Sequence, residues 1–311
     1  MNKNFNHQTW LGVGIIVITM FCMALADAVV KFASPNLTLW QIFTIRSLLV
    51  LAILIVIHFM ASHHHIQGKD GRFWVMMRSI FLSMMYICIY AGIPIVDLST
   101  IAVSLYTAPI FIVLFTAMFL NEPVGKTRWI AVFIGFLGVI IALQPNKDGF
   151  SYAALIPIAG AVFYALSAII TRKYCHDHST VSLAIYLNVV LLLTGVIASL
   201  GLHYYDDMAL TEFYPFLFGA WENMALKEWW IITLLTALML LISLGFAKAY
   251  QIAPPPVLAS FDYSYLIFAL LLGLFLFQET LYANKLIGMA FIIAGGIFAI
   301  STKPSSQAKT E

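Results

Sequence analysis

The chain has 311 residues, of which 62% are hydrophobic and 10% are charged. A soluble globular chain has roughly 45–50% apolar and about 25% charged residues, so lipid must solvate most of this surface. The 16 Lys and Arg residues nearly balance the 14 Asp and Glu residues. The net charge of +2 gives no sign of an acidic polymer as partner, and we expect no nucleic-acid binding.

Neither a cofactor nor a metal ion is expected. The three cysteines, Cys22, Cys88 and Cys175, are scattered and show no CxxC spacing. They are too few for a disulfide framework and do not match a metal-binding pattern. We expect them to be small apolar packing residues.

The first apolar run could be mistaken for a secretory signal, because Lys3 precedes it and Ala24-Leu25-Ala26 imitates a cleavage site. The run from Trp10 to Val30 spans about 21 residues, however, whereas the apolar region of a signal peptide has about 7–15. We therefore interpret it as the first membrane-spanning helix.

Ten apolar runs are long enough, or nearly long enough, to cross a bilayer core about 30 Å thick as helices. The predicted fold is an all-α integral membrane protein with ten transmembrane helices. The expected spans are 10–30, 39–60, 73–94, 98–120, 128–144, 151–173, 180–202, 229–252, 256–277 and 284–302.

Lys and Arg in the short loops predict the orientation, because they are enriched on the cytoplasmic side. With the N-terminus inside, nine lie in cytoplasmic segments and four on the opposite side. The sequence thus predicts a multi-pass protein of a bacterial inner membrane with both termini in the cytoplasm. The nine are Lys3, Lys69, Arg72, Lys126, Arg128, Arg172, Lys173, Lys303 and Lys309, and the four are Lys31, Lys147, Lys227 and Lys285.

The chain also contains an internal duplication, which is typical of repeat architectures. At an offset of 157, residues 102–143 align with 259–300 without gaps. The matching pairs include Tyr106/Tyr263, Glu122/Glu279 and Gly138/Gly295, with the basic pair Arg128/Lys285 in step. At an offset of 141 the first helix aligns with the sixth, where Lys31 matches Arg172.

Each repeat would contain five helices, so the second copy must enter the membrane in the opposite orientation. We predict two inverted five-helix repeats, 10–144 and 151–302, followed by a cytoplasmic tail, 303–311. Inverted repeats suit alternating access about a site near the membrane midplane.

The stretch from Tyr106 to Leu143, YTAPIFIVLFTAMFLNEPVGKTRWIAVFIGFLGVIIAL, carries an Asn-Glu-Pro turn and a Gly135/Gly138 helix. A weaker copy includes Gln278-Glu279 and Gly295-Gly296. In these features the chain resembles the EamA family of the drug/metabolite transporter superfamily. The resemblance implies ten helices, cytoplasmic termini and transport of amino acids, nucleotide derivatives, vitamins or other small metabolites.

Two short stretches narrow this resemblance. Ala24-Leu25-Ala26-Asp27-Ala28-Val29-Val30-Lys31, and then Trp40-Gln41-Ile42-Phe43 with Arg46, are similar to a bacterial subgroup associated with S-adenosylmethionine uptake. Riboflavin importers and amino-acid or metabolite exporters belong to the same superfamily, so these substrates stay open.

Asp27 and Arg46 are the ionisable residues inside the predicted spans that most need an explanation, because each costs about 2.5–3.5 kcal/mol to insert. The matching positions in the second half are Ala168 and Leu187, so the scaffold alone does not require the charges. They could form a structural ion pair, bind substrate or a proton, or face water separately. Lys31, one turn from Asp27, could also neutralise it.

Aromatic residues near the predicted midplane suit an amphipathic or aromatic solute, because a tyrosine offers both a ring face and a hydroxyl. Helix packing alone is the alternative. Pro109 is expected to kink the span 98–120 beside Tyr106, and Glu122 and Glu279 to interact with Arg128 and Lys285 or to cap helices 128–144 and 284–302. The complete candidate substrate site is Tyr106, Tyr263, Asp27, Arg46, Tyr86, Tyr90, Trp40 and Asp262.

No GxSxG, HExxH or DDxxD motif indicates an enzyme, and no GxxxxGK[ST] loop indicates direct use of ATP. We therefore expect a secondary transporter of a small organic metabolite, with a membrane-embedded enzyme as the remote alternative. Its expected partners are the solute and the lipid bilayer. Proton coupling and the oligomeric state are left open.

Overall fold

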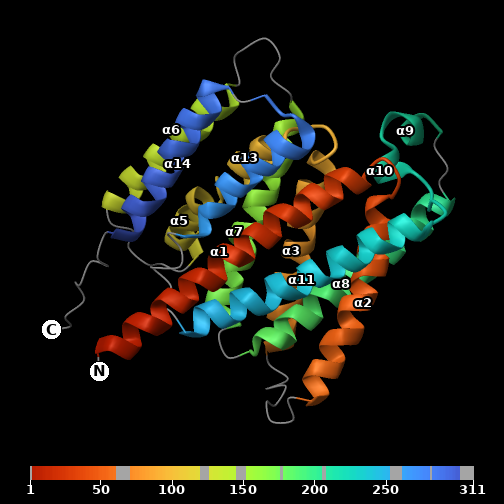
Figure 1. Cartoon of the computed structure of the whole chain (residues 1–311), viewed down its shortest axis with the longest axis horizontal. Helices are drawn as coiled ribbons and strands as arrows, with labels where there is room; N and C mark the ends of the chain where they lie inside the picture. The colour runs from red at the N-terminus through yellow and green to blue at the C-terminus, as the bar shows by residue number, and fades with distance from the viewer. Residues whose placement is uncertain are drawn as a thin grey trace.

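The computed structural model describes residues 2–60, 71–119, 126–144, 152–175, 178–204, 208–252, 261–280 and 282–301. Over these residues the protein is all-helical and contains no strand (Figure 1). Helices suit an apolar surface in lipid, because they satisfy their own backbone hydrogen bonds. The helices are α1 (Asn2–Ala33), α2 (Leu39–Met60), α3 (Arg72–Gly92), α4 (Leu98–Leu105), α5 (Ala108–Phe119), α6 (Lys126–Leu143), α7 (Leu155–Tyr174), α8 (Thr180–Tyr204), α9 (Met208–Phe213), α10 (Pro215–Phe218), α11 (Leu226–Ile252), α13 (Ser264–Phe277) and α14 (Ala283–Ser301), with a 3₁₀ turn at Tyr152–Ala154.

The described residues contain seven helical stretches long and apolar enough to cross a membrane. Three further apolar helical stretches are shorter, at 10–17 residues each. All ten lie within or overlap the runs that the sequence predicts to span. The shorter stretches are Trp129–Leu143, Ser264–Phe277 and Ala283–Gly295.

The main helix pairs join the N-terminal and C-terminal parts of the chain. α1 packs along α11, α2 along α8, α3 along α7, and α6 along α14. Figure 1 shows α6 and α14 side by side at one end of the molecule, with α2 and α8 at the other. The core therefore lies between the two parts of the chain and not within each.

Glycine allows α6 and α14 to approach each other closely. A Cβ at Gly138 would lie 2.6 Å from the Gly288 carbonyl oxygen, and a Cβ at Gly288 would lie 2.4 Å from that of Gly138. Small residues are how membrane helices pack backbone to backbone. Gly295 makes a similar close approach, because its Cβ would lie 2.8 Å from the Ala131 carbonyl oxygen.

The fourth predicted span is interrupted. α4 ends at Leu105 and α5 begins at Ala108, with Tyr106 and Thr107 in a turn. Leu105 is the residue four positions before Pro109, and its carbonyl is the group that a proline leaves without a helical donor and crowds with its ring. The predicted kink is confirmed as a complete break.

A shorter interruption lies at the position that the 157-residue offset matches to Tyr106. Phe261 and Asp262 are helical, Tyr263 is in a turn, and α13 begins at Ser264. The tyrosines paired by the 157-residue offset thus both occupy a break in a helix.

The segment between α8 and α11 covers the start of α2. Phe216 is buried, and Trp40 Nε1 donates a hydrogen bond of 2.7 Å to the Leu217 carbonyl oxygen. Other aromatic residues of this segment, among them Phe213, are exposed. The segment is therefore packed against the protein at its centre, and its outer aromatic side chains are exposed.

Candidate functional site

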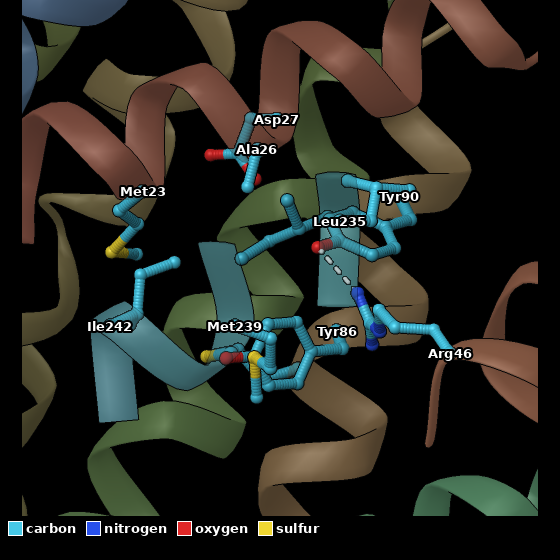
Figure 2. Close-up of a pocket in the computed structure, with 11 residues that line it drawn as sticks. Met23, Ala26, Asp27, Arg46, Tyr86, Tyr90, Leu235, Met239 and Ile242 are labelled. Carbon is cyan, nitrogen blue, oxygen red and sulfur yellow. Dashed lines mark hydrogen bonds between the residues drawn. The ribbon is translucent and has the colours of Figure 1, made fainter. Parts of the chain in front are cut away.

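A buried cavity lies where α1, α2, α3 and α11 meet (Figure 2). The volume open to water in this cavity is about 20 Å³, which is enough for about one water molecule. A metabolite would need these helices to separate. The lining residues are Met23, Ala26 and Asp27 of α1, Arg46 of α2, Met85, Tyr86, Ile89 and Tyr90 of α3, and Leu235, Met239 and Ile242 of α11.

Asp27 and Arg46 enter this cavity from different helices and do not pair with each other (Figure 2). No ion pair within 4.0 Å joins their side chains. Asp27 Oδ2 instead accepts a hydrogen bond of 2.6 Å from the Tyr265 hydroxyl. The structural ion pair that the sequence left open is therefore not formed.

Arg46 is 1% exposed. Its Nη1 donates a hydrogen bond of 3.3 Å to the Tyr90 hydroxyl, and the guanidinium carbon lies 5.5 Å and 5.8 Å from the ring centres of Phe43 and Tyr90. Among the residues that the structure describes, its Nε and Nη2 have no hydrogen-bond partner. Burying N–H donors of a cation without acceptors is costly, so their retention here requires an explanation.

The paired tyrosines meet beside the cavity. The rings of Tyr106 and Tyr263 are 5.2 Å apart, and those of Tyr106 and Tyr265 are 5.8 Å apart. The Tyr106 hydroxyl donates a hydrogen bond to the Asp262 backbone carbonyl oxygen. Since Tyr265 also holds Asp27, this cluster connects the two helix breaks to the acid of the cavity.

The structure divides the predicted site residues into two groups. Asp27, Arg46, Tyr86 and Tyr90 line the cavity, whereas Tyr106, Tyr263 and Asp262 form the neighbouring tyrosine cluster. Trp40 belongs to neither group, because it hydrogen-bonds to Leu217 in the segment between α8 and α11.

Sequence reasoning did not single out Tyr265, although a signal for it exists. The matching position in the first repeat is Ala108, so Tyr265, like Asp27, is a polar residue that the duplication does not share. Three lining methionines, Met23, Met85 and Met239, were also missed. A methionine in a span rich in apolar residues gives no comparable signal.

The prediction that Glu279 interacts with Lys285 or caps the helix 284–302 is wrong. The Glu279 carboxylate accepts hydrogen bonds from Lys31 Nζ at 2.8 Å and from the Leu98 backbone N–H at 2.7 Å, so it lies at the N-terminus of α4, where the helix dipole favours an anion. Lys285 forms an ion pair with Asp97. Lys31 forms its ion pair with Glu279 and not with Asp27. Glu122 lies outside the described residues.

Comparison with known proteins identifies the kind of domain in the first half of the chain. Residues 10–144 match the EamA-like transporter family. The chain carries an EamA domain. It is a multi-pass membrane protein, and its relatives include proteins named as transporters of bacteria. Within the part of the chain that the structure describes, no group of three or more His, Cys, Asp or Glu side chains could hold a metal ion.

Curated relatives of this chain are named for different solutes. It is 22% identical to the S-adenosylmethionine uptake transporter of Rickettsia bellii over 96% of each chain. It is 29% identical to the riboflavin transporter of Vibrio cholerae, over 62% of this chain and 59% of that protein. The pseudopaline exporter of Pseudomonas aeruginosa is 23% identical over 60% of this chain and 65% of the exporter.

The fold also occurs in a solved structure. One crystal structure aligns with 91% of this chain and 97% of its own, with a TM-score of 0.61 and 14% identity. At this identity the likeness concerns the fold alone.

Proposed function

We propose that the protein is a secondary carrier that moves a small organic metabolite across the membrane by alternating access, with the cavity around Asp27 and Arg46 as its solute site. The observation that carries this proposal is the cavity itself. It holds an acid and a base that do not neutralise each other, at the junction of three N-terminal helices with α11. Ionisable groups inside a membrane mark solute or proton pathways.

The carrier has ten transmembrane helices in two inverted repeats, 10–144 and 151–302, followed by the tail 303–311. The helix pairs support this arrangement. Exchanging the repeats turns the α1–α11 pair into the α7–α3 pair, and leaves α2–α8 and α6–α14 as pairs of matching elements; all four pairs are in contact. A two-fold relation between the repeats accounts for this set at once.

Alternating access follows from the same arrangement. The cavity is nearly closed in this conformation, and the repeats would rock about it to open one side and then the other. Both termini face the cytoplasm in this proposal, because the loops on the same side of the membrane as the termini carry the excess of Lys and Arg. The Lys31–Glu279 contact then belongs to the outer end.

The solute is S-adenosylmethionine or a similar amphipathic, aromatic compound. Tyr86 and Tyr90 provide ring faces, the methionines adaptable apolar contacts, and Asp27 and Arg46 charge. The near full-length match to the Rickettsia uptake protein supports this choice. An amino-acid or metabolite exporter, or a riboflavin-type importer, is the alternative supported by the other relatives. A membrane-embedded enzyme is the remote alternative.

Uptake by purified protein in liposomes, with and without a proton gradient, tests the proposal. The panel contains S-adenosylmethionine, riboflavin and the proteinogenic amino acids, with ATP absent. We expect at least one solute to enter protein-containing liposomes faster than empty ones, without ATP. Transport of no amino acid, nucleoside derivative or vitamin would overturn the metabolite-carrier proposal.

A further inference from the structure

We propose that the cavity recognises a zwitterion: Arg46 binds a carboxylate of the solute, and Asp27 binds its cationic group. This inference rests on the proposed function, because it names the chemical class that the same cavity accepts. Its basis is the geometry of the unused hydrogen-bonding groups.

The free donors of Arg46 lie on one edge of its guanidinium. Nη1 is held by Tyr90, whereas Nε and Nη2 have no hydrogen-bond partner within the described part of the chain. Nε and Nη2 carry the two parallel N–H groups of the side-on edge, which matches the two oxygens of a carboxylate. A single anionic group of the solute would thus satisfy both orphan donors at once.

The rest of the guanidinium is fixed. The rings of Phe43 and Tyr90 lie within 6 Å of its central carbon, a distance at which a cation is attracted to an aromatic face. Together with the Tyr90 hydrogen bond, they leave the side-on edge as its unused surface. A planar fork held in this way favours a carboxylate over a spherical halide and over a neutral group, because only the carboxylate supplies two charged acceptors.

Asp27 supplies the opposite charge in the same cavity. Its Oδ2 accepts the Tyr265 hydrogen bond, and its side chain is 6% exposed. No Lys, Arg or His of the described ranges forms an ion pair with it, and Lys31 is bound to Glu279. An ammonium or sulfonium group of the solute would supply the missing positive charge.

The remaining lining selects the organic part of the solute. Met23, Met85 and Met239 are unbranched and polarizable, and they adapt to irregular shapes. Because the cavity now holds about one water molecule, these flexible side chains and the helices around them must move apart when a solute enters. The predicted ligand is therefore an amino-acid-like zwitterion with an apolar or aromatic substituent.

Pairs of solutes that differ only in the carboxylate test this inference on the unaltered protein. Competition for uptake into liposomes is measured for S-adenosylmethionine and its decarboxylated form, and for each amino acid and its corresponding amine. We expect removal of the carboxylate to weaken competition by about 10-fold or more, the effect of losing a hydrogen-bonded charge pair. Equal competition within each pair would overturn the inference while leaving the carrier proposal intact.

The variant Arg46→Gln assigns the effect to one residue. We expect it to weaken the zwitterion by about 10-fold or more and the decarboxylated partner hardly at all, whereas Arg46→Lys restores part of the affinity. Arg78→Gln is the control, because Arg78 is a half-buried arginine on α3 that lies outside the lining and donates to Thr171. An equal loss for both solutes in Arg46→Gln would contradict carboxylate recognition.

Two further outcomes have distinct meanings. Transport of riboflavin, which lacks a carboxylate, without competition by any zwitterion would overturn this inference and retain the carrier. Transport of nothing in the panel would overturn the carrier proposal itself.

Discussion

Lys31 at the end of α1 donates a hydrogen bond of 2.8 Å to Glu279 Oε1, just beyond the end of α13. Glu279 also accepts the Leu98 backbone N–H at 2.7 Å. One carboxylate therefore holds three helix ends together: those of α1 and α13 and the start of α4. Such a contact must open if the two repeats are to separate at this end of the membrane.

Replacing Glu279 by Gln should destabilise the closed end. The Glu279 side chain is 7% exposed and that of Lys31 is 15% exposed, so the change leaves a mostly buried ammonium without its counter-charge. We expect the free energy of unfolding to fall by about 1–3 kcal/mol, measured by denaturation in detergent. The exposed Glu212 provides the control, as Glu212→Gln should have no measurable effect. Equal stability of the two variants would show that the contact is not structural.

Gly273 makes room for this carboxylate. A Cβ at Gly273 would lie 2.4 Å from Glu279 Oε2, closer than two unbonded atoms can approach. We expect Gly273→Ala to displace Glu279 and to reproduce the stability loss of Glu279→Gln. In the double variant the two losses should not add. Full additivity would refute the steric link.

Gly138 and Gly135 on α6 provide a matched pair. A Cβ at Gly138 would meet the Gly288 backbone, whereas one at Gly135 would have no neighbour within 4 Å. Gly138→Ala should lower stability by about 1–3 kcal/mol through forced separation of α6 and α14. Gly135→Ala should be neutral or slightly stabilising, because alanine favours a helix. Thermal unfolding of both variants in one detergent measures the difference. A larger loss of stability in Gly135→Ala than in Gly138→Ala would contradict the close packing of α6 and α14 at Gly138.

Tyr265→Phe removes the hydroxyl that holds Asp27. We expect transport to fall by about 10-fold, since a hydrogen bond to a charged group contributes about 1.5–3 kcal/mol, while the amount of folded protein stays close to normal. Tyr174→Phe is the control, because Tyr174 stacks on Trp74 and lies outside the cavity lining. Normal initial uptake rates for Tyr265→Phe would separate the tyrosine cluster from the solute site.

The helical fold was accessible from the sequence because apolar runs of bilayer length constrain the backbone strongly. The break beside Tyr106 was also accessible, since Pro109 removes a defined donor. The pairing of individual charges could not be predicted from the sequence. The duplication placed Lys285 near Glu279 in sequence, but tertiary packing brought Lys31 and the α4 N-terminus to Glu279 and Asp97 to Lys285. Along the sequence, Glu279 is 248 residues from Lys31 and 181 from Leu98, and Lys285 is 188 residues from Asp97.

The candidate site was recovered in part for a related reason. Asp27 and Arg46 stood out because the second repeat lacks them, and the structure places both in one cavity. Tyr265 breaks the duplication in the same manner. The contribution of α11, through Leu235, Met239 and Ile242, depends on how the two halves pack and has no signature in the local sequence.

Uptake by Asp27→Asn in liposomes tests the central claim most directly. The substitution keeps the size of the side chain and an oxygen acceptor for Tyr265, and removes only the charge. We expect the variant to insert and fold like the unaltered protein but to transport the solute no longer. Normal transport by Asp27→Asn at matched protein content would contradict the role of this cavity as the solute site.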